Sequence, residues 1–204
     1  MIKYAVIVIP SFSTRLVETT RVETSAGTGD TVAVGAAGSC VTCVMEGARP
    51  VLAEVQALVA PSNANYPRRT CNGLDSNRAA MLLAVLEKRG GLKVSQCDAY
   101  FNIIGGLTLD EPASDLAVLT AVASSYLDKP IPTKLAAMGE VGLSGEIRSI
   151  NHIEQRLAEV QRLGFTRCIV PAQQADKLRI LGKLQLIPAK NVGQALRLLA
   201  HDEL

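Results

Sequence analysis

Hydrophobic residues recur along the chain with two spacings, one typical of strands and the other typical of helices. Continuous or alternating runs rich in Val, Ile, Leu and Ala predict strands, and apolar residues three and four positions apart predict helices. The predicted strands are Ser39 to Met45, Pro50 to Val59, Ala99 to Ile104, Leu135 to Val141, Cys168 to Val170 and Leu184 to Ile187. The predicted helices are Glu111 to Leu127, Ile153 to Leu163, a short one after Ala172 and a final one through Val192 to Leu199.

The clearest helix begins after Asp75 or Ser76, either of which can cap its amino terminus. Its apolar positions continue to Leu86, basic residues occupy its last turn, and Gly90-Gly91 ends it. The segment before it, Ala60 to Gly73, is predicted to be a polar loop.

Because strands and helices interleave, the chain is predicted to have an α/β fold, an α+β two-layer arrangement in which helices cover a mixed sheet. The first residues differ from the rest, since they are β-rich and end in a Gly-Ala-Ala-Gly segment at residues 35–38. We therefore expect a leader of residues 1–38 and one folded domain of residues 39–204. The strands predicted in the leader are Ala5 to Ile9, Leu16 to Thr24 and Thr31 to Val34.

The charge balance is close to neutral, with 21 basic residues, 19 acidic residues and a net charge of +2. A protein held on nucleic acid by overall charge alone is far more basic, so any DNA contact requires a local patch. Aromatic residues make up 3% of the chain, which disfavours base stacking on single strands and favours contact with a duplex backbone.

The five cysteines are scattered, which fits a reducing cytosol rather than a disulfide framework. Cys40 and Cys43 have the spacing of half a zinc site, but a second pair is missing and strand residues three apart point to opposite faces. We expect no metal and no cofactor, and a cytoplasmic location. The ending His201-Asp202-Glu203-Leu204 matches a retention signal of secreted chains, but the apolar stretch Tyr4 to Ile9 is short for a signal peptide. No apolar run approaches the roughly 18 residues of a membrane span.

Two common catalytic arrangements are missing from the sequence. There is no glycine-rich loop ending in Lys and Ser/Thr, so the chain lacks a P-loop for ATP. A Ser-His-Asp triad would have to use His152, which is expected to begin a helix.

Three groups of motifs stand out along the chain. They are Leu52-Ala-Glu-Val-Gln-Ala-Leu-Val59 with Pro67-Arg68-Arg69 and Gly73-Leu-Asp-Ser-Asn-Arg78, then Asn102-Ile-Ile-Gly-Gly106 with Glu111-Pro-Ala-Ser-Asp-Leu-Ala117, and then Gly139-Glu-Val-Gly-Leu-Ser-Gly-Glu-Ile-Arg148. In the same order and with similar spacing, these motifs resemble the carboxy-terminal Lon-protease-like domain of the RadA (Sms) family of bacterial DNA repair and recombination proteins. The resemblance runs from about Ser39 to the end.

The resemblance implies a Lon-protease-like fold without its peptidase chemistry. Lon peptidases carry the nucleophilic serine in a Gly-Pro-Ser-Ala-Gly turn, and the similar turn in this chain places Ala113 at that position. The position that corresponds to the lysine base is Glu154. Serine needs an adjacent base to become nucleophilic, so the chain is predicted to be no enzyme. A shifted dyad of Ser114 with Lys129 or Lys134 is the alternative, although Ser114 is expected to cap the following helix.

The resemblance also implies partners. In the family this domain assembles into a ring, expected to be a hexamer, and contacts duplex DNA, while a RecA-like ATPase occupies a domain that this chain lacks. The chain is thus expected to be a fragment or a truncated gene product. The alternatives are an assembly platform without DNA affinity and a residual serine peptidase.

Arg68, Arg69 and Arg78 are the best candidates for phosphate contacts, because they cluster near the polar loop. Lys88, Arg89 and Lys93 lie farther along. The simpler interpretation is that these are solvated charges, with Arg78 paired to nearby Asp75.

Overall fold

The computed structural model describes residues 20–21, 31–32, 36–132, 134–176, 178 and 182–200. Of the leader, it describes two short antiparallel strands, β1 (Thr20–Arg21) and β2 (Thr31–Val32), and residues 36–38. The predicted strand Ala5 to Ile9 lies outside the described residues. The division into a leader and a domain therefore stays a prediction.

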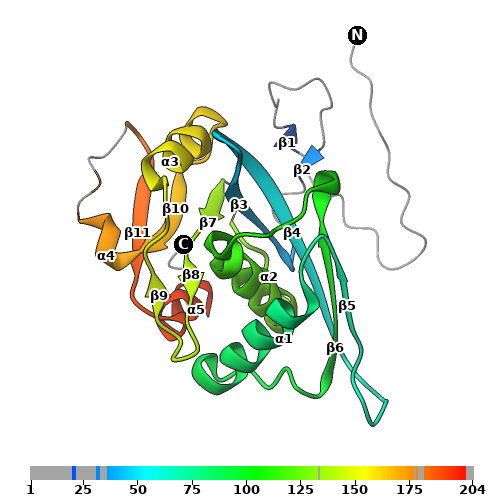
Figure 1. Ribbon diagram of the computed structural model, residues 1–204. Helices are drawn as coiled ribbons and strands as arrows, with labels where there is room; N and C mark the ends of the chain where they lie inside the picture. Colours follow the sequence, from blue (N-terminus) through cyan, green and yellow to red (C-terminus); the bar gives the residue numbers. More distant parts are fainter. Residues whose placement is uncertain are drawn as a thin grey trace.

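One mixed sheet of seven strands organises the described residues (Figure 1). Its strands are β3 (Ser39–Glu46), β4 (Arg49–Pro61), β5 (Arg69–Asn72), β6 (Cys97–Ile103), β7 (Leu135–Ala137), β10 (Arg167–Pro171) and β11 (Gln185–Ala189). Their order across the sheet is β11-β10-β7-β3-β4-β6-β5. The β3–β4 and β4–β6 pairs are antiparallel, and the other pairs are parallel. A separate hairpin joins β8 (Glu140–Val141) to β9 (Ile147–Arg148).

Helices cover the two faces of this sheet unequally. They are α1 (Ser76–Val85), its π-helical continuation η1 (Leu86–Gly90), α2 (Asp115–Leu127), α3 (Ile153–Arg162), α4 (Ala172–Ala175) and α5 (Val192–Ala200), with short 3-10 turns η2 (Ile104–Gly106) and η3 (Pro112–Ser114). Residues of α1, α2 and α5 form the larger hydrophobic cluster with one face of the sheet. Residues of α3 form the second cluster with the opposite face, over β3, β7 and β10.

The burial of α2 and α3 follows their sequences. Every residue of α2 from Asp115 to Ser124 is buried, as expected for a helix that is apolar nearly all round. Helix α3 instead buries Ile153, Leu157 and Val160, which recur at intervals of three and four, and exposes its other side. One buried residue of this stripe, Arg156, is charged.

The predicted α/β class is confirmed, with two corrections to the strands. The predicted loop Ala60 to Gly73 contains β5, which is only four residues long and is held by parallel pairing with β6, far along the chain. The predicted strand Leu135 to Val141 is interrupted after Ala137, because the Gly139 N–H turns to donate to the Ala113 carbonyl at 2.8 Å. Both corrections come from nonlocal hydrogen bonds that local patterns do not encode.

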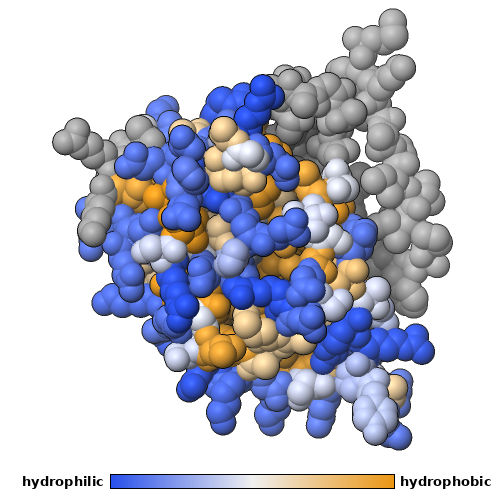
Figure 2. Space-filling view, viewed as in Figure 1, coloured by the Kyte–Doolittle hydropathy of each residue, from blue (hydrophilic) through white to orange (hydrophobic). Residues whose placement is uncertain are grey.

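The surface seen in the orientation of Figure 1 is mostly hydrophilic, with smaller hydrophobic areas between charged side chains (Figure 2). Among the helices of the described part of the chain, none is long and apolar enough to cross a membrane.

Candidate functional site

The turn that resembles the nucleophile turn of Lon peptidases lies in η3, immediately before α2. Ala113 is 5% exposed and belongs to the cluster that α3 completes. Because its carbonyl accepts the Gly139 N–H, both the side chain and the backbone of this residue are engaged in packing. The position has neither a nucleophilic atom nor an open approach.

Ser114 is 2% exposed, and its Oγ donates to the Glu111 carbonyl at 2.9 Å. Ser114 is the N-cap residue of α2, as predicted, but its side chain makes no cap hydrogen bond, since the hydroxyl bonds backwards within the turn. Lys129 follows the far end of α2, roughly 20 Å away at 1.5 Å per residue. Lys134 lies just before the first residue of β7. Ala113 lies near the other end of that strand, where its carbonyl accepts the Gly139 N–H. Neither lysine can serve as a base for Ser114 in this arrangement.

The cation that binds Glu111 in this turn is Arg156. Glu154 is exposed on α3, whereas Arg156 is 1% exposed. The Arg156 guanidinium donates to both carboxylate oxygens of Glu111 at 2.6 Å, and also to the Cys43 carbonyl at 2.6 Å and the Asn151 carbonyl at 2.9 Å. A guanidinium stays protonated and accepts no hydrogen bond, so it cannot act as a general base.

Glu111 binds β3 as well as α3. Its Oε1 also accepts the Met45 N–H at 2.9 Å. Burial acts to raise the pKa of this carboxyl, but the hydrogen bonds from Arg156 and Met45 outweigh it and hold the pKa below its usual value. Glu111 is therefore ionised at neutral pH and ties three segments together.

Asp115 forms a second buried ion pair at the other end of the turn. It is 2% exposed, accepts the Arg78 Nε–H at 2.8 Å and the Val141 N–H at 2.9 Å, and pairs a second time with the Arg78 guanidinium. Burial raises the pKa of Asp115 above its usual value, against the lowering effect of Arg78 and Val141. The predicted Arg78–Asp75 pair is wrong: Asp75 instead caps α1 by accepting the Arg78 backbone N–H at 2.8 Å.

The three arginines predicted to contact DNA occupy different environments. Arg78 is 30% exposed and engaged with Asp115. Arg69 reaches along the edge of the sheet to backbone carbonyls, including those of Val94 at 3.1 Å and Cys97. The side chain of Arg68 is exposed, and only its backbone is bonded, with its N–H donating to Asp98 at 2.7 Å. The structure therefore leaves one of the three, Arg68, displayed to solvent.

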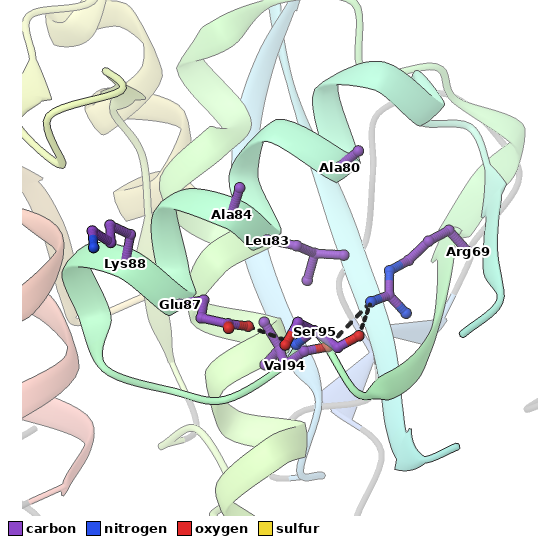
Figure 3. Close-up of a pocket in the computed structure, with 8 residues that line it drawn as sticks. All are labelled: Arg69, Ala80, Leu83, Ala84, Glu87, Lys88, Val94 and Ser95. Atoms are coloured by element: carbon purple, nitrogen blue, oxygen red, sulfur yellow. Dashed lines mark hydrogen bonds between the residues drawn. The ribbon is translucent and has the colours of Figure 1, made fainter. Parts of the chain in front are cut away.

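Arg69 also lines a shallow pocket of about 480 Å³ beside α1 (Figure 3). Its remaining walls are Ala80, Leu83, Ala84, Glu87, Lys88, Val94 and Ser95. The Glu87 carboxylate accepts the Ser95 N–H at 2.6 Å, so the polar groups of the pocket are largely bonded to one another. Lys88 is the exposed cation on its rim.

The cysteines are placed as small core residues. Cys40 and Cys43 belong to the two separate hydrophobic clusters on opposite faces of the sheet. Burial raises the pKa of the Cys43 thiol to about 12 and that of Cys40 further, which disfavours the thiolate that a metal requires. In the residues that the structure describes, no group of three or more His, Cys, Asp or Glu could hold a metal ion.

Sequence reasoning missed Arg156 and its partner Glu111. The available signal was a charge on the apolar stripe of a predicted helix, because Arg156 lies between Ile153 and Leu157. Its partner, 45 positions earlier, carries no local signal.

Comparison with known proteins finds one matching family and several similar relatives. Residues 100–201 match the family described as the Lon protease (S16) C-terminal proteolytic domain. The chain is 48% identical over 163 residues to DNA repair protein RadA of Streptococcus pneumoniae, which is 80% of this chain and 39% of the relative. It is 47% identical to DNA repair protein RadA of Bacillus subtilis and 46% identical to that of Listeria monocytogenes, in each case over 80% of this chain and 36% of the relative.

These relatives confirm the resemblance predicted from the sequence motifs. The chain spans well under half of their length, 36–39% in these three relatives. By its sequence match and its mixed α/β architecture, the chain belongs to the family of the Lon protease C-terminal proteolytic domain and is similar to the RadA DNA repair proteins.

Proposed function

We propose that this chain is a noncatalytic Lon-like domain of a RadA-type DNA repair protein, acting in ring assembly and in contact with duplex DNA. The observation that carries the noncatalytic part is the closed turn, in which Ala113 is buried and Arg156 binds Glu111. The relatives, each named a DNA repair protein, support the cellular role. A cytoplasmic location and a separate RecA-like ATPase domain belong to the same proposal.

Duplex contact in this proposal is electrostatic and local. Arg68 is exposed next to Arg69, which lines the α1 pocket, and Lys88 is exposed on the rim of that pocket. In the described part of the chain, neither side chain has an ion-pair partner. A ring would repeat such a weak patch around its axis, and repetition raises avidity without new contacts.

The test is duplex binding by fluorescence anisotropy over a range of salt concentrations. The affinity should fall as salt rises, and Arg68→Ala should weaken it. Arg49→Ala is the matched control, since Arg49 is also exposed. Arg49 begins β4, and the end of that strand nearest Arg68 is roughly 40 Å away at 3.3 Å per residue. The DNA part of the proposal fails if the wild-type chain does not bind duplex at low salt.

The second candidate is an assembly platform without DNA affinity. It is favoured by the engagement of Arg69 and Arg78 in structural bonds, which leaves fewer cations for phosphates. Light scattering together with the anisotropy assay separates the two candidates. Assembled particles that bind no duplex at low salt would favour the platform, and a strict monomer would exclude it.

A residual serine peptidase is the third candidate, and Ser114 is the residue that it would need. The bond from Ser114 to the Glu111 carbonyl and its burial argue against it. We expect no casein turnover above background, and no difference between wild type and Ser114→Ala. Turnover that disappears in this variant would revive the peptidase.

A further inference from the structure

The sheet carries a surface on β4, β6 and β5 that none of the helices in the described part of the chain covers. The strand register places three rows of side chains on it, with Leu58, Tyr100 and Thr70 in the central row. One flanking row contains Gln56, Asn102 and Asn72, and the other contains Ala60 and Asp98, beside which Arg68 lies. We call these nine residues the outer face.

The central row of the outer face is exposed, although alternate residues of the same strands are buried in the core. Leu58 is 61% exposed and Tyr100 is 36% exposed, whereas the alternate residues Ala99 and Phe101 are 1% and 3% exposed and face the core. None of the nine residues belongs to either hydrophobic cluster that the described helices complete. An aromatic side chain is thus exposed in the middle of the outer face.

The composition around Tyr100 suits nucleotides better than an apolar protein surface. Six of the nine residues are polar, while the centre of a protein interface is depleted in charged residues. Asn72 donates its amide to the Asn102 carbonyl oxygen at 2.8 Å, and this bond leaves the Asn102 amide hydrogens and the Asn72 oxygen for other partners. Side-chain amides beside an exposed aromatic ring are the groups that read and stack unpaired bases.

The charge at one end of the outer face favours phosphates. The segments 62–69 and 92–98 contain three cations, Arg68, Arg69 and Lys93, and one carboxylate, Asp98. That carboxylate accepts the Arg68 backbone N–H at 2.7 Å, and the neighbouring charges of Arg68 and Arg69 offset its own. Tyr66, at the tip of the same end, is 89% exposed and provides a second aromatic ring.

From this arrangement we propose that the outer face binds single-stranded nucleic acid, with Tyr100 as the stacking platform, Arg68 on the phosphates and the Asn102–Asn72 row on base edges. Open sheets with exposed aromatics bind unpaired bases by this combination of stacking and backbone charge. The proposal replaces the expectation from composition that base stacking is disfavoured, since the few aromatic rings include the exposed Tyr66 and Tyr100. It goes beyond duplex contact, because stacking requires unpaired bases that a duplex backbone does not offer.

The absence of tryptophan from the chain gives a site-specific test. In Tyr100→Trp the only indole lies on the outer face, and a stacked base quenches its fluorescence. Titration with an oligothymidylate of about 12 nucleotides should quench this signal. Tyr126→Trp is the matched control, since Tyr126 is 37% exposed but lies on α2, and its signal should not change.

Affinity for the same oligonucleotide provides the second measurement. Tyr100→Ala should weaken binding roughly ten-fold, Tyr100→Phe should retain it, and Tyr126→Ala should match wild type. Duplex affinity should stay unchanged in Tyr100→Ala, which separates this proposal from the duplex contact of Arg68.

Three results would overturn the proposal: no binding of the oligonucleotide, binding without quenching of Trp at position 100, or equal affinity of Tyr100→Ala and wild type. Smaller particles of Tyr100→Ala in light scattering, with oligonucleotide affinity unchanged, would also overturn it and assign the face to a second copy of the chain.

Discussion

The Glu111–Asp115 turn and the outer face of β4, β6 and β5 differ in whether their polar side chains are bonded within the chain. In the turn, Glu111 and Asp115 are each held by an arginine, and Ser114 is 2% exposed. On the outer face, Tyr100 and its neighbours keep open hydrogen-bonding groups. The polar groups of the turn are satisfied internally, whereas those on the surface remain able to bind a partner.

This contrast has an energetic basis. A buried ion pair contributes little compared with a well-packed apolar pair, but removing one partner is strongly destabilising because the other charge stays buried. Removing an exposed side chain leaves no buried charge behind, so it changes the free energy of unfolding little. Mutations should therefore affect stability in the turn and binding on the surface.

The largest expected effect is on Arg156. Arg156→Ala removes a guanidinium that is 1% exposed and leaves the Glu111 carboxylate and the Cys43 carbonyl without it. We expect a loss of about 3–5 kcal/mol in the free energy of unfolding, measured by urea denaturation. The control on the same helix is Arg162→Ala, which breaks the exposed pair with Glu159 and should cost under about 1 kcal/mol. Equal losses would show that the Arg156 pair is not a structural clamp.

Arg78 should show the next largest effect. Arg78→Ala leaves the carboxylate of Asp115, which is 2% exposed, with the Val141 N–H as its remaining charge-stabilising partner, and should cost about 2–4 kcal/mol. Asp75→Ala, which removes only the helix cap, should cost about 1 kcal/mol. Urea denaturation of both variants checks the order, and a larger loss in Asp75→Ala would contradict the assignment of Arg78 to the buried pair.

The pH dependence of stability sharpens the comparison further. The pKa of Glu111 is lower in the folded chain than in the unfolded chain, so its contribution is fully present above about pH 4.3 and is lost as the pH falls through the folded-state pKa. Below about pH 4.3, wild type should therefore lose stability more steeply than Glu111→Gln. Urea denaturation between about pH 3 and pH 6 measures both slopes, and parallel slopes would contradict the lowered pKa.

The smallest expected effect belongs to Arg68. Arg68→Ala should leave stability unchanged, weaken duplex binding only a few-fold and reduce the salt dependence by about one phosphate contact. A loss of stability like that of Arg78→Ala would mean that Arg68 is a structural residue.

The sequence predicted local features well because their physical causes are local. The cap at Asp75 and the continuous apolar strand from Ser39 depend on neighbouring residues, and the structure has both. Strand β5 could not be predicted, since Arg69 to Asn72 are mostly polar and become a strand only by pairing with β6. The break after Ala137 likewise depends on a bond to Ala113.

The candidate site was predicted only in part, for the same reason. The assignment of Ala113 and Glu154 to the dyad positions rests on the motifs and stays a prediction, and the buried Arg156, two residues after Glu154, was not singled out. Arg78 was grouped with Arg68 by proximity in the chain. Its ion pair lies 37 positions away, at Asp115, which local spacing does not reveal.

The mass of particles in solution, measured with and without duplex DNA, tests the central claim most directly, namely that this domain acts through assembly and surface contact rather than catalysis. The account predicts assembled particles that gain the mass of the duplex at low salt. Monomers whose mass does not change when duplex is added would contradict it.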